Sequence, residues 1–328
     1  MSDWPRVRLH VVTGKGGTGK TTVAAALALA LATGGQRVLL CETERRQGIA
    51  RLFDLDPLPY QECAIAVAPG DGEVYALAID AEGALLDYLE MYYHLGRAGR
   101  ILDRFGVVDF ATTIAPGLRD VLLTGKVYEA HGRRDRSGHR AYDAIVLDAP
   151  PTGRIVSFLN VNAEVAGLAR VGPIRHQADA IMQVLRSRGT AVHLVTLLED
   201  MPVQETADAI RDLAAVDLPL GGVVVNQAHG SPLDATTRKA VAATSLAPTD
   251  LVAGLTAAGI DDPAPAAVAA ALLGEAAEHI ERLELEERLL GQVEDLDRPI
   301  YRLPTLSEGI DLGGLYDLAA MMRAQQLA

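Results

Sequence analysis

Short, mainly apolar runs alternate along the chain with longer stretches in which apolar residues recur every three to four positions. The runs are rich in β-branched residues or Leu, which is typical of strands buried on both faces of a parallel sheet. They lie at Val7–Val12, Arg37–Cys41, Ala144–Leu147, Val192–Leu197, Gly222–Val225 and Pro299–Leu303. Because helical periodicity follows the first four runs, the pattern predicts a doubly wound, mainly parallel α/β sheet.

Two longer stretches interrupt this alternation. Between residues 54 and 140, a short strand pair at Ile65–Val67 and Tyr75–Ile79 precedes a mostly helical pattern. Residues 234–292 are also helical in pattern, with Asp262-Pro263 as a start signal, since proline is favoured in the first helical turn. We expect helical additions packed on the sheet at about 82–131, 160–190 and 234–295.

Charge and composition narrow the class of protein. Hydrophobic residues make up 49% and charged residues 22% of the 328, which favours a folded globular protein over a disordered one. The 30 basic and 43 acidic residues give a net charge of −13, which argues against binding of nucleic acid as the main task. The chain has only four lysines, and two of them, Lys15 and Lys20, lie five positions apart.

Cysteine content and the N-terminal residues bear on cofactors and location. The two cysteines, Cys41 and Cys63, form no CxxC pair, and the eight histidines are scattered without the spacing of a zinc site. Two cysteines are also too few for an iron–sulfur cluster. The N-terminal residues have no basic segment followed by an apolar core, the mark of a signal peptide. We therefore expect a cytoplasmic protein without zinc or an iron–sulfur cluster, and peripheral attachment to a membrane stays open.

A glycine-rich segment lies between the first run and an apolar helix. Glycines let the backbone curl so that successive N–H groups face phosphate oxygens, and the helix N-terminus adds a favourable field. The lysine at the helix start would reach the β- and γ-phosphates, and the threonine after it would ligate Mg²⁺. The predicted phosphate-binding residues are Gly14, Gly16, Gly17, Thr18, Gly19, Lys20, Thr21 and Thr22.

A carboxylate follows the third run. Asp148 ends that strand, beside the expected position of the first strand, where a residue can reach Mg²⁺ through a water molecule. Thr21 and Asp148 are therefore the predicted metal-side residues, and ATP with Mg²⁺ is the predicted cofactor pair.

These motifs resemble a known family. Residues 14–21 match GKGGxGKT, the deviant P-loop of the ArsA, MinD and nitrogenase-iron-protein class. The segment Asp148–Gly153 resembles the DTAPTGH switch of the ArsA-type family of arsenite-pump and tail-anchored-protein-targeting ATPases. The resemblance implies that Lys15 crosses a dimer interface to the partner's nucleotide. It also implies that the turn at Asp148–Gly153 moves after the γ-phosphate is lost, with Arg154 in place of the family's usual histidine.

Three further segments extend the resemblance over nearly the whole chain. Residues 42–48 occupy the place of the family's DTDPAH segment, which implies that Glu44 orients the attacking water from a position one methylene further out. Val223–Gln227 resembles the VVNQ strand end, which implies that Asn226 reads the adenine edge. Leu303–Leu306 resembles the loop that closes over the base, which implies a nucleotide contact at Pro304.

The resemblance implies a single P-loop ATPase domain over residues 1–328, with Lys15, Lys20, Glu44 and Asp148 as catalytic residues. We predict a dimeric switch ATPase that couples its nucleotide state to a hydrophobic client or a membrane protein. The alternative is a weakly hydrolysing scaffold that pairs with a paralogous ATPase as a heterodimer. Residues 82–129 and 161–186 would either cover the sheet or form a shallow client groove.

Overall fold

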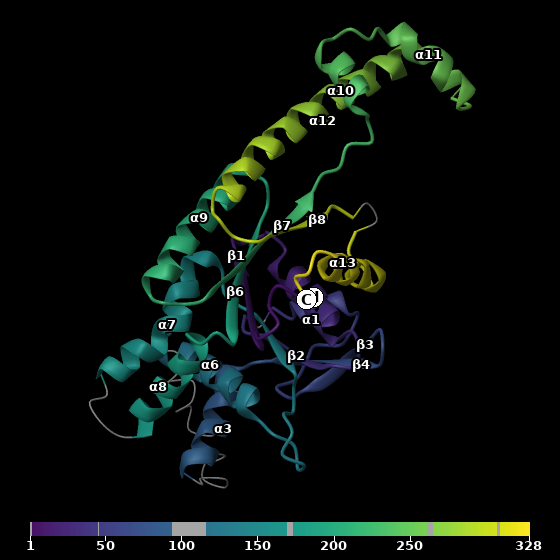
Figure 1. Cartoon of the computed structure of the whole chain (residues 1–328). Coiled ribbons are helices and arrows are strands. Elements are labelled where there is room, and N and C mark those ends of the chain that lie inside the picture. The colour runs from purple at the N-terminus through teal and green to yellow at the C-terminus, as the bar shows by residue number, and fades with distance from the viewer. Residues whose placement is uncertain (1, 45, 94–115, 169–172, 261–264, 307–308) are drawn as a thin grey trace.

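Eight strands form one sheet in the order β3-β4-β2-β5-β1-β6-β7-β8 (Figure 1). The computed structural model describes residues 2–44, 46–93, 116–168, 173–260, 265–306 and 309–328. The strands are β1 (Leu9–Gly14), β2 (Arg37–Glu42), β3 (Cys63–Ala68), β4 (Gly72–Ala78), β5 (Ala144–Asp148), β6 (Thr190–Thr196), β7 (Leu220–Ala228) and β8 (Ile300–Pro304). All neighbouring strands run parallel except β3, which is antiparallel to β4.

The apolar runs locate the strands. Each of the six predicted parallel strands lies on an observed one, and the doubly wound α/β fold is confirmed. The predicted strand pair is the β3–β4 hairpin. It joins the main sheet, because β4 pairs in parallel with β2, with Leu39 opposite Tyr75. The local pattern could not show this, since it contains no information about which strand a hairpin adds to.

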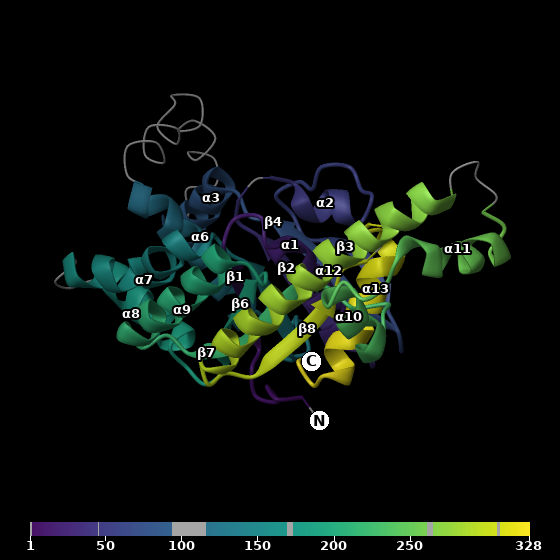
Figure 2. The same ribbon diagram turned by 90° about the horizontal axis from the view of Figure 1, so that it is seen from above.

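Helices cover both faces of the sheet (Figures 1 and 2). The described helices are α1 (Lys20–Ala32), α2 (Gly48–Leu52), α3 (Ala81–Tyr93), α6 (Pro116–Gly132), α7 (Thr152–Leu168), α8 (Pro173–Leu185), α9 (Asp200–Ala215), α10 (Ala235–Ala242), α11 (Pro248–Ala257), α12 (Pro265–Glu294) and α13 (Leu312–Ala324). One face carries α1 and α13, and Leu315, Leu318 and Met322 of α13 are buried there. Small alanines let α1 lie close to the strands, which fixes the position of its N-terminus.

The opposite face carries α6, α7 and α8. Leu123 and Val127 of α6, Phe158 of α7 and Ile181 of α8 belong to one buried cluster with the strands. In the described residues, these helices therefore cover the sheet, which is the first of the two alternatives for this region. Residues 94–115 of the predicted 82–129 helical pattern lie outside the described residues.

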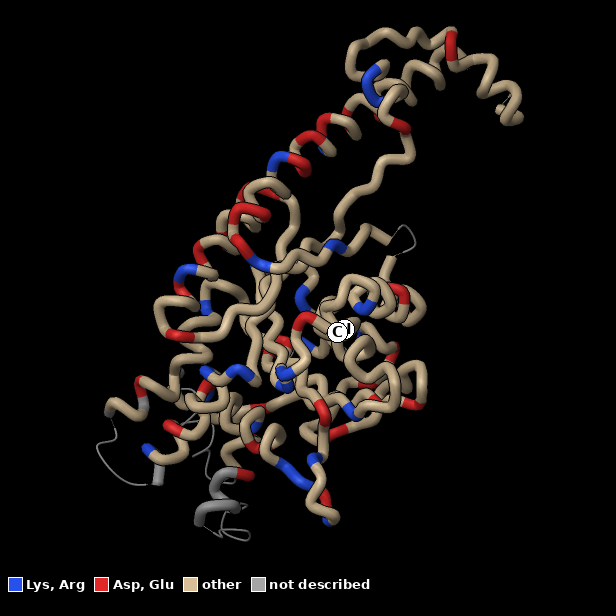
Figure 3. Tube along the Cα trace, viewed as in Figure 1, with Lys and Arg blue, Asp and Glu red and all other residues tan. Residues whose placement is uncertain are grey.

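The region 234–295 packs on the sheet with one end and extends away from it with the other (Figures 1 and 2). Leu289 and Val293 near the C-terminus of α12 are buried against β7 residues. No residue of α11 is buried, and Leu272 of α12 is 40% exposed. Charged residues are frequent along α12 (Figure 3). None of the described helices is long and apolar enough to cross a membrane. The Asp262-Pro263 start signal lies outside the described residues.

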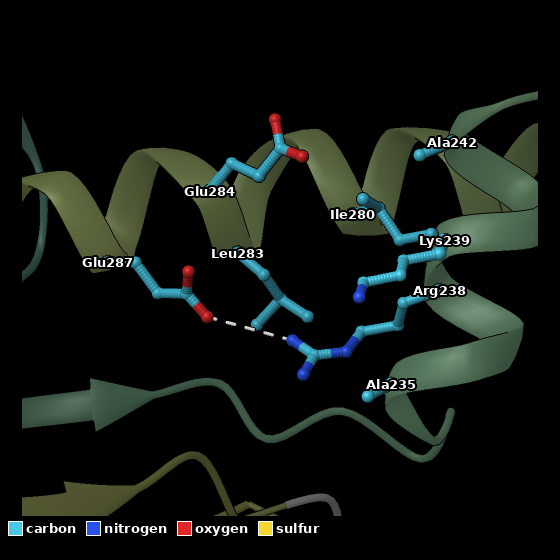
Figure 4. A pocket seen from close by; sticks show the side chains of 8 residues that line it. All are labelled: Ala235, Arg238, Lys239, Ala242, Ile280, Leu283, Glu284 and Glu287. Carbon is cyan, nitrogen blue, oxygen red and sulfur yellow. Dashed lines mark ion pairs between the residues drawn. The ribbon is translucent and has the colours of Figure 1, made fainter.

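Two polar contacts connect α12 to α10 and to the segment after β7. Arg238 of α10 points toward Glu287 of α12 across a small pocket, with 3.6 Å between Nη1 and Oε1 (Figure 4). Glu286, predicted neither as core nor as contact, is buried and accepts from the backbone N–H of His229 at 3.1 Å. Helix α12 therefore buries one carboxylate beside its apolar residues. The hydrogen bond to this carboxylate stabilises it in the buried position.

A buried histidine pair links β1 to β6. The rings of His10 and His193 are stacked, and Nδ1 of His10 lies 3.1 Å from Nε2 of His193. Nδ1 of His193 accepts from the backbone N–H of Gly222 at 3.2 Å, so its proton lies on Nε2 and is donated to His10. Burial lowers the pKa of His10 to about 4 and that of His193 well below its ordinary value.

This pair predicts loss of stability in mild acid. Between pH 6.5 and 4 the unfolded chain binds protons that the folded pair excludes, so the free energy of unfolding falls as pH falls through this window. Each histidine contributes a slope of up to about 1.4 kcal/mol per pH unit. We expect His10→Asn to reduce the slope, measured by urea unfolding at several pH values. The exposed His176 on α8 provides the control, His176→Asn, and an equal reduction there would contradict the assignment.

Candidate nucleotide site

The carboxyl ends of β2, β5, β1 and β7 meet at one edge of the sheet. Parallel strands in such sheets bind ligands at this edge, in the crevice where the strand order reverses. Glu42, Asp148 and Gly14 are the last residues of β2, β5 and β1, and Asn226 lies near the end of β7. Three of the four were predicted as site residues, and the fold brings them together.

The phosphate loop runs from the end of β1 to the start of α1. A Cβ added to Gly14 would lie 2.2 Å from the carbonyl oxygen of Val195, so only glycine fits there. Gly17 and Gly19 have φ values of 93° and 84°, which glycine adopts without steric cost. The Thr18 hydroxyl donates to the Lys15 carbonyl at 2.9 Å and closes the loop. The loop thus has the curled conformation that its glycines predict.

Lys20 heads helix α1 and faces the loop. Its ammonium donates to the Lys15 carbonyl oxygen at 3.3 Å. Burial lowers the pKa of Lys20, while the negative charges of Asp148 and Glu44 raise it. The side chain is therefore placed inside the loop, where a phosphate oxygen could replace the carbonyl as its partner.

Two carboxylates and a hydroxyl form a cation-suited cluster beside Lys20. The Thr21 hydroxyl donates to Oδ2 of Asp148 at 2.7 Å, and Glu42 lies opposite Asp148 in the β2–β5 register. Oε1 of Glu42 accepts from the Gly48 N–H at 3.0 Å. Its Oε2 is buried with no partner among the described residues. Burial, together with the charge of Glu42, raises the pKa of Asp148 to about 7.

These residues fit Mg²⁺. An unpartnered buried carboxylate oxygen is costly, and a cation within reach would remove that cost. Mg²⁺ usually keeps several waters and takes one or two protein oxygens plus substrate phosphates. In the described part of the chain, no group of three or more His, Cys, Asp or Glu side chains could hold a metal ion. Sequence reasoning missed Glu42, although its position at a strand end just before Thr43 was a usable signal.

Glu44 reaches the same region but is paired. Its Oε2 lies 3.4 Å from Nε of Arg46, and its side chain is 23% exposed. Its charge acts on both Lys20 and Asp148, so the carboxylate lies near the phosphate loop. The predicted catalytic acid is thus at the site, with Arg46 as its contact.

The C-terminal part of β7 contacts the phosphate loop directly. Nδ2 of Asn226 donates to the carbonyl oxygen of Thr18 at 2.9 Å, and the side chain is buried. A Cβ on Gly19 would lie 2.4 Å from the same Nδ2. Pro304 pairs with Ala228 in the β7–β8 register, and the Thr305 hydroxyl donates to the Gln227 carbonyl at 3.0 Å. The two segments predicted to flank the base therefore lie side by side.

Lys15 points away from its own phosphate loop. Its Nζ lies 2.7 Å from Oε1 of Glu205 on α9, and the hydroxyl of Thr152 donates to Oε2 of the same carboxylate at 3.0 Å. The hydrogen bond from Lys15 lowers the pKa of Glu205. No sequence signal indicated Glu205, because the contact joins residues 190 positions apart.

Helix α6 contacts both segments that flank the site. Arg119 of α6 donates to the Thr43 carbonyl at 3.4 Å. Asp120, also of α6, is buried and pairs with Arg154 at 3.4 Å, directly after the Asp148–Gly153 turn. The arginine in place of the family's histidine thus has a partner, and α6 connects the segments after β2 and β5.

The strand, glycine loop and helix, with Lys20 and Thr21 at the helix start and acids at the adjacent strand ends, define a P-loop ATPase of the α/β class. The sequence model of the anion-transporting ATPase family, ArsA_ATPase, matches residues 7–188. The chain belongs to this ArsA-type family of ATPases.

Named relatives agree with this assignment. The protein called ATPase BagA from Mycobacterium tuberculosis is 53% identical over 330 residues, covering 98% of this chain and 95% of the relative. The arsenical pump-driving ATPase of Escherichia coli is 31% identical over 237 residues, covering 65% of this chain and 38% of the relative. ATPase GET3 of Candida glabrata is 23% identical over 252 residues, covering 66% of this chain and 71% of the relative.

Proposed function

We propose that the chain, working as one ATPase domain, is a Mg²⁺-dependent switch that hydrolyses ATP as a dimer. The observation that carries this proposal is the contrast between its two loop lysines. Lys20 faces the interior of the loop, whereas Lys15 extends toward α9 and cannot serve the same phosphates from there. A cation supplied by a second subunit would offset the charge that develops on the transferring phosphoryl group.

Thr21 would hold Mg²⁺ directly, and Asp148 and Glu42 would hold it through water. Mg²⁺ held there would neutralise charge on the β- and γ-phosphates. Lys20 binds the γ-phosphate, and the loop N–H groups orient the phosphate chain for in-line attack. Glu44 orients the attacking water after its carboxylate leaves Arg46.

The output is a change of conformation. Loss of the γ-phosphate relaxes the Asp148–Gly153 turn, and the Arg154–Asp120 ion pair transmits that movement to α6. The Arg119 contact with Thr43 links the same helix to the segment after β2. Helix α6 therefore follows nucleotide state, and a hydrophobic client or a membrane protein would sense the helical layer. We place this activity in the cytoplasm, with peripheral attachment to a membrane as a variant.

Turnover should depend on protein concentration. Because two chains must meet to complete a site, the rate per chain is expected to rise with concentration before it saturates. The test is Mg²⁺-dependent phosphate release over a dilution series, with sedimentation in ATP and ADP. A rate per chain that is constant down to concentrations at which the protein sediments as a monomer would contradict the dimer.

Glu44 separates the proposal from its alternative, a scaffold that needs a paralogous ATPase subunit. If the longer acid sets the rate, Glu44→Asp is expected to raise turnover about tenfold, since errors of about 1 Å in position can cost 100-fold. Glu62, whose contacts lie with Arg133 and Tyr142, gives the control Glu62→Asp. Tight ATP binding with negligible turnover in both the wild type and Glu44→Asp would favour the heterodimer.

Asn226 is proposed to read the adenine edge while it supports the loop. We expect Asn226→Ala to weaken ATP binding about tenfold, because a buried hydrogen bond and a base contact are both lost. Inorganic triphosphate lacks a base, so its affinity should fall less. Calorimetry with ATP, GTP and triphosphate separates these contributions. An equal loss for all three ligands would assign Asn226 to loop support alone.

A further inference from the structure

One carboxylate on α9 contacts two parts of the site that move in the proposed cycle. Glu205 of α9 binds Lys15 of the phosphate loop through Oε1 and Thr152, the first residue of α7, through Oε2. We call Lys15, Glu205 and Thr152 the Glu205 bridge. Both side-chain oxygens of Glu205 are therefore occupied, one by each of two segments that respond to nucleotide.

The bridge competes with the arrangement that hydrolysis requires. Lys15 has one ammonium group, and at 2.7 Å from Glu205 it is paired within its own subunit. To reach a partner's nucleotide it has to leave this carboxylate. Thr152 follows the Asp148–Pro151 segment directly, so the same carboxylate also fixes the end of the turn that is expected to move.

We propose that Glu205 is a positioning residue that keeps Lys15 and the Asp148–Gly153 turn in a resting state, which ATP-driven dimer formation must release in one step. This inference rests on the proposed function, since it assigns a regulation to the same site. The pair is partly exposed, with side-chain exposures of 29% for Lys15 and 34% for Glu205. A contact of that kind is strong enough to bias an equilibrium and weak enough to open in each cycle.

The first test uses the nucleotide-free chain and does not depend on ATPase activity. In Glu205→Gln, the amide keeps the size of the side chain but loses the charge that attracts Lys15. Hydrogen exchange in the Asp148–Arg154 segment is expected to become faster. Asp208 lies one turn further along α9 and pairs with Arg211, so Asp208→Asn removes the same charge without touching the bridge. Unchanged exchange in Glu205→Gln, or an equal increase in the Asp208→Asn control, would overturn the bridge.

The second test measures dimer formation in ATP. An exposed ion pair of this kind favours the resting state of each subunit by about two- to fivefold. Because both subunits must release the pair, the two factors multiply. Glu205→Gln should therefore dimerise at about four- to twenty-five-fold lower protein concentration. Adding Lys15→Ala should abolish this gain, because no lysine remains to be released. Weaker or unchanged dimerisation of Glu205→Gln, beside a wild type that dimerises, would overturn the inference. A wild type that neither dimerises nor hydrolyses ATP would instead refute the proposed function.

Discussion

Lys15→Ala is expected to lower ATP turnover about 1000-fold while leaving nucleotide binding to the single chain nearly unchanged. Cations that stabilise the transferring phosphoryl group are worth about 10³ to 10⁵ in rate when supplied from a second chain. In the isolated chain Lys15 binds Glu205 and not the loop interior, so its removal should cost little ground-state affinity. A residue that acts across a dimer interface is expected to change the turnover rate and to leave the nucleotide affinity of the single chain nearly unchanged.

The measurement is steady-state turnover beside ATP affinity by calorimetry. Lys239 on α10 is the matched control, because Lys239→Ala removes the same charge far along the chain from the phosphate loop. Turnover within about threefold of the wild type in Lys15→Ala would contradict the role of Lys15, since a lost catalytic cation costs far more. If ATP affinity fell in Lys15→Ala as much as turnover does, Lys15 would instead contact the nucleotide of its own subunit.

Asp148→Asn is expected to reduce Mg²⁺-dependent turnover about 100- to 1000-fold, because the loss of one positioned electrostatic group costs this much in comparable sites. The amide has nearly the same shape as the carboxylate and can still accept from Thr21. The variant loses the buried negative charge. That charge attracts a divalent cation, whereas the folded structure does not require it. Burial raises the pKa of Asp148 to about 7, so the charged form is costly without a cation nearby.

For this variant, Mg²⁺ titration should shift to higher concentration, while ATP binding in the presence of a chelator stays unchanged. Asp143 precedes the same strand and accepts from the Arg37 backbone N–H at the other end of the sheet, so Asp143→Asn is the control. Because removal of an unsupported buried charge relieves a cost, Asp148→Asn should also raise the stability of the nucleotide-free chain above pH 7. An unaltered Mg²⁺ requirement would contradict the assignment.

The fold was largely predictable because its signals are local. The parallel strands are mainly apolar runs, and the phosphate loop combines glycines with Lys20 and Thr21 within one short segment. Such features depend on neighbouring residues in the chain, so a short stretch of sequence contains them. Asp148 was found for the same reason, since it ends a strand.

The missed residues depend on contacts between distant segments. Glu42 gains its role from lying opposite Asp148 in a sheet register, and Glu205 from the packing of α9 beside the loop. Region 234–295 was expected to pack on the sheet, yet Leu272 of α12 is exposed because the helix extends beyond the sheet. Periodicity shows which face of a helix is apolar, but not how much of its length meets a neighbour.

The most direct test of the central claim, that Lys15 completes the partner's site, mixes two inactive variants. In a mixed dimer, the Lys15→Ala subunit keeps its own Asp148 and receives Lys15 from the Asp148→Asn subunit, so one of its two sites is intact. Equal mixing should therefore restore about one quarter of wild-type turnover, since half of the dimers are mixed and half of their sites work. If Lys15 served its own subunit, both sites would stay defective. Turnover no higher than the mean of the separate variants would contradict the account.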